Sequence, residues 1–141
     1  MTGSQRLMTT AAIVTAVVIT LAADATALVI AVRDQQSALS ASFDAAVTLS
    51  FVVVGAVVAG ARPRNLIGWL MLAGGAFWAM GSVLSDMGHH GIVVSPGSVA
   101  GVSAYVIAGA ICRSIGLDAI TNAVPVFFPD GKVAGPRWRW L

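Results

Sequence analysis

Two long apolar runs meet at a short hinge that carries two arginines. The first run, residues 43–61, contains a single charge, Asp44, and the second, residues 66–85, contains none. Each run is close to the roughly 20 apolar residues that cross the ~30 Å hydrocarbon core of a bilayer as a helix. We therefore expect the hinge to be a turn at a membrane surface. Because short cytoplasmic loops carry an excess of Lys and Arg, Arg62 and Arg64 place this turn on the cytoplasmic side.

The composition argues against a water-soluble domain. The 141 residues are 57% hydrophobic and 10% charged, with a mean hydropathy of +0.88, whereas typical soluble chains are about 25% charged. The net charge of +2 does not indicate nucleic acid, because most basic residues lie in segments that we expect at the cytoplasmic face. Anionic lipid head groups, and the bilayer as a whole, are the predicted partner. The single cysteine, Cys112, can form no disulfide within the chain.

Residues 7–32 form a further apolar run, interrupted by Asp24. The run can be a signal peptide, with Arg6 as its basic start and an A-x-A-like cleavage site at residues 25–27. It can also be a retained first transmembrane helix, because the apolar pattern resumes beyond that site and the whole run is long enough to span a bilayer. Length and flanks favour the retained helix.

The rest of the chain completes an alternating topology. Residues 33–42 and 86–97 are polar, and the second of these segments has no Lys or Arg, so both are predicted to be external loops. The last apolar segment, residues 98–128, is longer than one untilted helix requires, and we expect a tilt or a bend near Gly116 or Pro125 to absorb the excess.

The predicted fold class is all-α, a polytopic membrane protein with four transmembrane helices in one bundle and both ends cytoplasmic. The chain is expected to form a single membrane domain, residues 1–141, in the plasma membrane. The helices are expected at about residues 7–32, 43–61, 66–85 and 99–123, followed by an interfacial tail at about 127–141. The residues expected to anchor the cytoplasmic interface are Arg62, Arg64, Trp69, Lys132, Arg137, Trp138, Arg139 and Trp140.

Small residues four positions apart mark one face of the second predicted helix. Gly55 and Ala59 form one such pair, and Ala56 and Gly60 form another. Such faces let helices approach closely in lipid, although an Ala-rich chain also produces the pattern by chance. We expect this helix to pack within the chain, and a homodimer through helix contacts is possible.

Charged residues inside the membrane are the natural candidates for a functional site, because a charge at the bilayer centre is costly unless it is paired or hydrated. Asp24 and Arg113 are predicted to pair across two helices. Asp118 lies five residues after Arg113, about 140° around a helix, so those two do not share a face. The predicted pair is either a proton or ligand site or a structural ion pair that fixes the helix register.

The sequence offers no catalytic or metal-binding pattern. His89 and His90 with Asp86 can be considered as metal ligands, but adjacent histidines point in different directions and no third strong ligand has a fitting spacing. A solvated loop is the preferred interpretation. Nucleotide-binding, metalloprotease and nucleophile-elbow motifs are absent from the sequence. We therefore predict no enzymatic activity, no cofactor and no metal for this chain.

Two motifs carry a resemblance to a known family. The sequence RNLIGWL at residues 64–70 resembles an NPIGWL turn, and FFPDGKVAGPRWR at residues 127–139 resembles LFPDGRLPSPRWR. Both patterns occur in the membrane-embedded amino-terminal regions of actinobacterial sensor histidine kinases. The resemblance covers roughly residues 43–139, with Leu66 where the family pattern has Pro.

The resemblance implies a sensory or anchoring membrane module of a two-component system that acts on a kinase output module, either carboxyl-terminal or separate. The dimerisation and ATP-binding motifs of the kinase core are not in this sequence. The rival prediction is a stand-alone small membrane protein, either a transporter-like oligomeric unit or an accessory subunit. A transporter would need an acidic or polar site at mid-membrane, for which Asp24 is the candidate.

Overall fold

The computed structural model describes residues 3–128, and these residues form an all-helical structure without strands. The elements are α1 (Gly3–Arg33), α2 (Ala38–Ala61), α3 (Leu66–His89), the π-helical turn η1 (His90–Val94), α4 (Val102–Asp118), the π-helical turn η2 (Ala119–Ala123) and α5 (Val124–Phe127). The described part contains four helical spans that are long and apolar enough to cross a membrane. The predicted all-α class with four such helices is confirmed, and this is the architecture of a multi-pass integral membrane protein.

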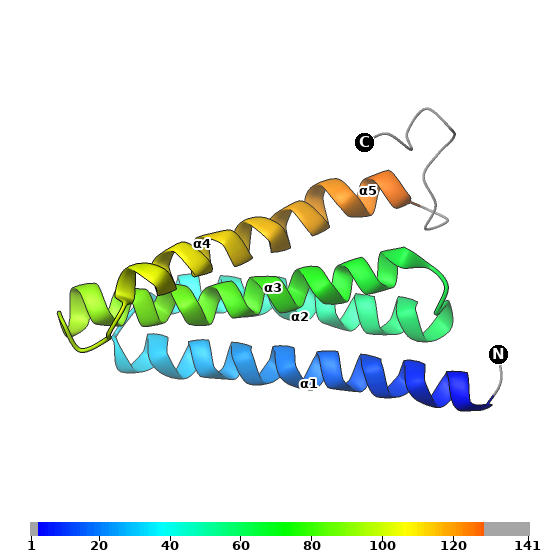
Figure 1. Cartoon of the computed structure of the whole chain (residues 1–141), viewed down its shortest axis with the longest axis horizontal. Helices are drawn as coiled ribbons and strands as arrows, with labels where there is room; N and C mark the ends of the chain where they lie inside the picture. The colour runs from blue at the N-terminus through cyan, green and yellow to red at the C-terminus, as the bar shows by residue number, and fades with distance from the viewer. Residues whose placement is uncertain (1–2, 129–141) are drawn as a thin grey trace.

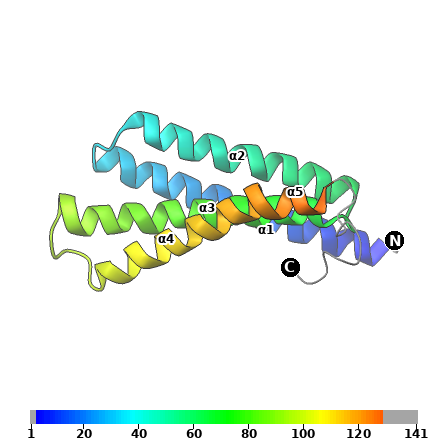
Figure 2. The ribbon, with the colours of Figure 1, turned by 90° about the horizontal axis from the view of Figure 1, so that it is seen from above.

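The helices lie side by side and alternate in direction (Figure 1). One end of the bundle, called here the hinge end, holds the start of α1, the α2–α3 turn and α5. The opposite end, called the loop end, holds the connections α1–α2 and α3–α4. Helix α3 is central, because it packs against α1, α2 and α4, whereas α4 packs mainly on α3. Figure 2 shows α4 and α5 crossing over α3 towards the α2 side. The cytoplasmic assignment of the hinge end stays a prediction.

The helices extend further at the loop end than predicted. Helix α2 begins at Ala38 rather than at residue 43, and α3 with η1 continues to Val94. The predicted loop 86–97 is therefore wrong over its first nine residues, and the connection is residues 95–101. Nothing in residues 86–94 interrupts a helix, since the first proline after α3 is Pro96.

A distortion of the last span occurs between the two positions at which a bend was expected. The π-helical turn η2 immediately precedes α5, in which Pro125 lies in the first turn. Proline lacks the backbone N–H for a bond to the preceding turn, and its ring clashes with that turn in a regular α-helix. A wider π turn is one way to accommodate such a residue. The tail anchors Lys132, Arg137, Trp138, Arg139 and Trp140 lie outside the described residues.

The hinge is a capped turn. The Asn65 side-chain oxygen accepts a hydrogen bond from the backbone N–H of Ile67 at 2.9 Å, and Trp69 Nε1 donates to the carbonyl oxygen of Pro63 at 3.0 Å. Leu66 is the first residue of α3. A proline is tolerated at that position but not required, so Leu66 fits the turn. Arg62 and Arg64 are exposed beside it.

Glycines on α3 permit close packing on two sides. A Cβ atom at Gly68 would lie 2.5 Å from the backbone nitrogen of Ala59 on α2. On the other side, a Cβ atom at Gly81 would lie 2.8 Å from the backbone nitrogen of Arg113 on α4. Gly55 also faces α3, so the predicted Gly55 and Ala59 face packs within the chain, whereas Gly60 faces open space. Backbone contact of this kind replaces the hydrophobic driving force that lipid does not supply.

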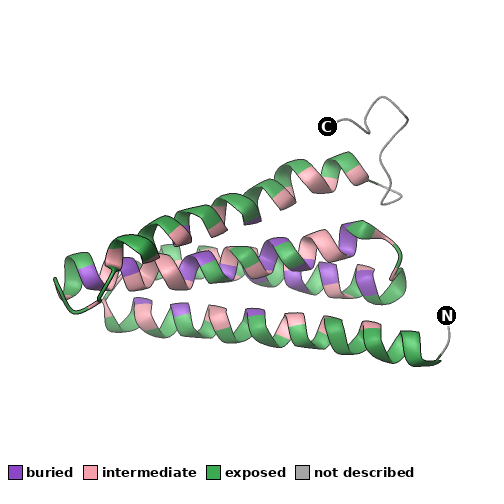
Figure 3. Ribbon diagram, viewed as in Figure 1, coloured by how far each residue is buried: buried purple, intermediate pink, exposed green. Residues whose placement is uncertain are grey.

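The bundle has a small apolar core and an apolar exterior. Val52, Ala59 and Leu72 form the buried cluster between α2 and α3. Many large apolar side chains are exposed instead, and the exposed residues cover the outward faces of the helices (Figure 3). An exposed apolar exterior around tightly packed glycines is expected of helices that face lipid tails.

The close contact at Gly68 predicts a large difference between two Gly→Ala substitutions. Gly68→Ala places a Cβ atom against the α2 backbone, and we expect the free energy of unfolding to fall by about 1–3 kcal/mol. The Cβ atom that Gly60→Ala adds has no other atom within 4 Å. Because alanine has a higher helix propensity than glycine, this substitution should raise the free energy of unfolding by about 0.5–1 kcal/mol. Titration with dodecyl sulfate in mixed micelles measures the free energy of unfolding of both variants. Equal stability of the two variants would contradict the packing.

Candidate functional site

Arg113 is the centre of a polar network inside the bundle. Its guanidinium extends from α4 to Asp44 on α2, with Nη2 donating to Oδ1 at 2.7 Å and Nη1 donating to Oδ2 at 3.0 Å. Two parallel bonds between a planar guanidinium and a carboxylate are strong and directional. The pair therefore fixes α4 relative to α2 although α3 provides most of the packing surface for α4.

Two residues of α3 complete the network. Arg113 Nη1 also donates to the Ser82 hydroxyl at 3.0 Å, and the guanidinium lies 4.5 Å from the centre of the Trp78 ring. The Trp78 indole nitrogen donates to Asp44 Oδ1 at 3.3 Å. Asp44, Trp78, Ser82 and Arg113, hereafter the Arg113 network, thus join three helices through charge, hydrogen bonds and a cation–π contact.

The predicted pair of Asp24 with Arg113 is wrong, because Arg113 binds Asp44. Helix α4 crosses α3 towards α2 (Figure 2), which brings Arg113 to Asp44 and leaves Asp24 on the far helix. Counted from the loop-end helix termini at about 1.5 Å per residue, Asp44 lies about 9 Å deep and Arg113 about 16 Å deep. The long arginine side chain can cover that difference. The sequence did contain a signal for Asp44 as the partner of Arg113, because Asp44 is the single charge in its apolar run.

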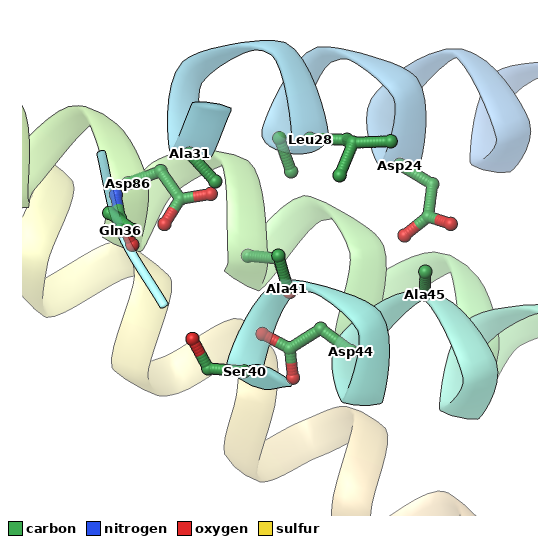
Figure 4. A pocket seen from close by; sticks show the side chains of 11 residues that line it. Asp24, Leu28, Ala31, Gln36, Ser40, Ala41, Asp44, Ala45 and Asp86 are labelled. Atoms are coloured by element: carbon green, nitrogen blue, oxygen red, sulfur yellow. The ribbon is translucent and has the colours of Figure 1, made fainter. Parts of the chain in front are cut away.

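Asp24 lines a cavity of about 30 Å³ near the loop end, together with Asp44 and Asp86. Figure 4 shows the three carboxylates around this space, each from a different helix. Such a volume holds about one or two water molecules. We call it the acidic cavity. Asp44 lies in both the cavity and the Arg113 network, so the two form one continuous polar site.

The other two carboxylates of the acidic cavity have neutral polar neighbours. Asp24 lies near the hydroxyl of Thr48, which is fully buried and has no hydrogen-bond partner of good geometry among the described residues. Asp86 lies near the side-chain amide of Gln36 in the α1–α2 connection, and the amide nitrogen is buried without a hydrogen-bond partner of good geometry among the described residues. Three carboxylates and one bound guanidinium leave an excess of potential negative charge in this part of the bundle.

A second ion pair lies at the loop end. His90 Nδ1 is 2.9 and 3.1 Å from the two carboxylate oxygens of Asp34. The Asp34 side chain is 3% exposed and the His90 side chain is 38% exposed. The expectation of solvated histidines is therefore wrong for His90, and the His89 Nδ1 atom is also buried. Within residues 3–128, no group of three or more His, Cys or Asp side chains has the geometry of a metal site.

Asp118 lies apart from the Arg113 network, as its angular separation from Arg113 predicted. It is exposed, and its carboxylate accepts a hydrogen bond from the Asn122 amide at 3.0 Å. Cys112, next to Arg113, is a free, half-buried thiol.

Comparison of the chain with models of known protein families, with curated protein sequences and with solved structures found no match. The function must therefore be inferred from the geometry of the polar site and from the motifs in the sequence.

The bidentate geometry predicts that Arg113→Gln is destabilising. It leaves the Asp44 carboxylate without its counter-charge, and we expect the free energy of unfolding to fall by about 1.5–3 kcal/mol. Asp118→Asn is the matched control, because it removes an exposed charge from the same span, and it should change stability by less than about 0.5 kcal/mol. The double variant with Asp44→Asn should be less destabilised than the sum of the single variants. Strict additivity in the same unfolding assay would contradict a direct pair.

Proposed function

We propose that this chain is the membrane-embedded input region of a signalling protein, in which the Arg113 network sets the position of α4 and α4 transmits it to an output module. The observation that carries the proposal is the bidentate contact between Arg113 and Asp44. It connects the last long helix, which leads to the carboxyl end of the chain, to α2. The resemblance of residues 127–139 to the segment before a kinase core supports this direction of coupling.

Signalling by this input region requires α4 to move against α3. The buried residues of α4 are Gly109 and Gly116, and both contact the α3 backbone. At Gly109 and Gly116 the two helices meet backbone against backbone, whereas Val106 of α4 packs over Gly88 nearer the loop end, so the segment around the two glycines is where α4 can move along α3. The polar bonds of Arg113 then decide which position is populated.

The acidic cavity is the place where a stimulus can act on this equilibrium. Asp44 faces both the cavity and Arg113, so a change of charge at Asp24 or Asp86 alters the electrostatic hold on the guanidinium. Protons and small hydrated cations are the stimuli that fit an acidic cavity of this size. Homodimerisation through the exposed helix faces stays a prediction.

The same cavity supports one rival function, a small transporter-like unit. Carboxylates from three helices in one membrane-embedded cavity are also found on ion pathways. Proton or cation flux into liposomes that contain the purified chain discriminates between the two. Flux that is lost in Asp24→Asn and retained in Asp118→Asn would favour the transporter, and absence of flux favours the input region.

Fusion of the chain to a sensor-kinase core tests the proposed function. We expect Arg113→Gln and Asp44→Asn to change autophosphorylation in nanodiscs in the same direction, by about fivefold or more, because each releases α4. Exchange of the two charges, Asp44→Arg with Arg113→Asp, should restore part of the wild-type output. Asp118→Asn is the control and should match the wild type. Wild-type output from all the variants would contradict the proposal.

A further inference from the structure

We propose that the groove between the start of α1 and the α2–α3 turn binds an anionic phospholipid, whose phosphate is held by Arg6 and Arg64. Both elements lie at the hinge end of the bundle (Figure 1), away from the acidic cavity. The inference goes beyond the proposed function and does not depend on it.

The groove consists of two adjoining depressions in the surface. The first has a volume of about 340 Å³, and its lining includes Arg6 of α1 and Gly60 of α2. The second has a volume of about 280 Å³, and its lining includes Arg64 of the turn. Thr9 and Pro63 line both depressions, so the two form one surface, called here the hinge groove. Each is about as large as the smaller ligand sites of proteins, which begin at roughly 300 Å³.

The packing of α1 leaves the hinge groove open. The buried residues of α1 are Thr20, Ala27 and Ala31, whereas residues 3–19 contain none. On the opposite wall, a Cβ atom added at Gly60 would meet no other atom within 4 Å. Residues 3–128 therefore do not fill this space, and in a bilayer the molecules beside it are lipids.

The lengths of the helices place the hinge groove at the level of the lipid phosphates. At about 1.5 Å per residue, the 31 residues of α1 are about 46 Å long and the 24 residues of α2 are about 36 Å long. The hydrocarbon core is about 30 Å thick, and about 40–45 Å with its head-group regions. Both helices therefore extend into the head groups, and Arg6 and Arg64 lie close to their ends.

The charge of the hinge groove is complementary to a phosphate. No acidic side chain lines either depression. Both ion pairs found within residues 3–128 lie outside the groove, so Arg6 and Arg64 have no acidic partner in that part of the chain. A guanidinium matches the geometry of phosphate through paired hydrogen bonds. Basic pockets between membrane helices are a known type of site for anionic lipid head groups.

The apolar part of the lining distinguishes a lipid from free phosphate. Ile13 lines the first depression and lies about two helical turns further along α1 than Arg6, on the side of the membrane interior. Gly60 lies opposite on α2, and its missing side chain leaves room there. An acyl chain can therefore lie along α1 and α2 while the arginines hold the head group.

The charge also argues against the carboxyl-terminal segment of the chain as the occupant. Residues 129–141, which lie outside the described part, carry Lys132, Arg137 and Arg139 against one acidic side chain, Asp130. A segment with a positive balance is repelled by two unpaired arginines, whereas a phosphate is attracted.

Native mass spectrometry of the full chain tests the site, because each bound lipid adds its own mass. The probes are dioleoylphosphatidylglycerol and dioleoylphosphatidylcholine, titrated separately against the delipidated protein in detergent. We expect the first phosphatidylglycerol to bind with a dissociation constant about fivefold or more below that of phosphatidylcholine. Inorganic phosphate at the concentration of the lipid should not displace it. Equal affinity for the two lipids, or displacement by inorganic phosphate, would overturn the proposal.

Charge variants separate a defined site from diffuse surface charge. Arg6→Gln and Arg64→Gln should each weaken binding of the first phosphatidylglycerol about fivefold. Arg62→Gln is the matched control, because Arg62 is exposed in the same turn but lines neither depression, and it should change binding by less than about twofold. All three side chains are exposed, so the variants should fold. Equal losses in Arg62→Gln and Arg64→Gln would contradict a site in the groove.

Gly60→Leu tests the shape of the hinge groove without changing its charge. The added side chain extends into the first depression. We expect it to weaken lipid binding by about fivefold or more, a loss comparable to that of one or two buried methylene groups. Unchanged affinity would contradict the position of the lipid. A lipid-free dimer of the wild type that Gly60→Leu abolishes would identify a second copy of the chain as the occupant and overturn the proposal.

Discussion

The cost of placing a charge in a low-dielectric environment governs this bundle. Arg113 lies well inside a membrane-spanning helix, and its charge is tolerated because Asp44, Ser82 and Trp78 surround the guanidinium. These partners come from α2 and α3, so satisfying one side chain fixes the relative positions of three helices. The interaction that makes the charge possible is thus also the interaction that orients α4.

Glycine placement makes that arrangement sterically possible. Contact between α3 and α4 at Gly81 and Gly109 is close enough for backbones to touch, which lets the Arg113 side chain reach α2. Val106 and Val102 of α4 also pack over Gly88 and Gly91, so side-chain packing at the loop end and the Arg113 bonds further along define the register together.

The sequence predicted the helices well and the polar contacts poorly, for physical reasons. Long apolar runs and the arginine hinge determine the number of helices, because the bilayer sets their length and permits few alternatives. Helix ends at the loop end were less accurate, since polar residues such as Asp86 and His89 suggested a loop, whereas no proline interrupts residues 86–94 and they stay helical. Asp24 was chosen over Asp44 because periodicity does not reveal which helices are neighbours or at what angle α4 crosses α3. Asp34 and His90 are 56 residues apart, and no local pattern joins them.

Distance distributions between spin labels on α2 and α4 probe most directly whether the Arg113 network sets the position of α4. Val57 on α2 and Ile107 on α4 are exposed and suit labelling after Cys112→Ser. In nanodiscs, one narrow distance population is predicted for the wild-type network, and a shifted or broadened population for Arg113→Gln. Identical distributions in the two proteins would show that packing on α3 alone positions α4, which would contradict the role assigned to Arg113.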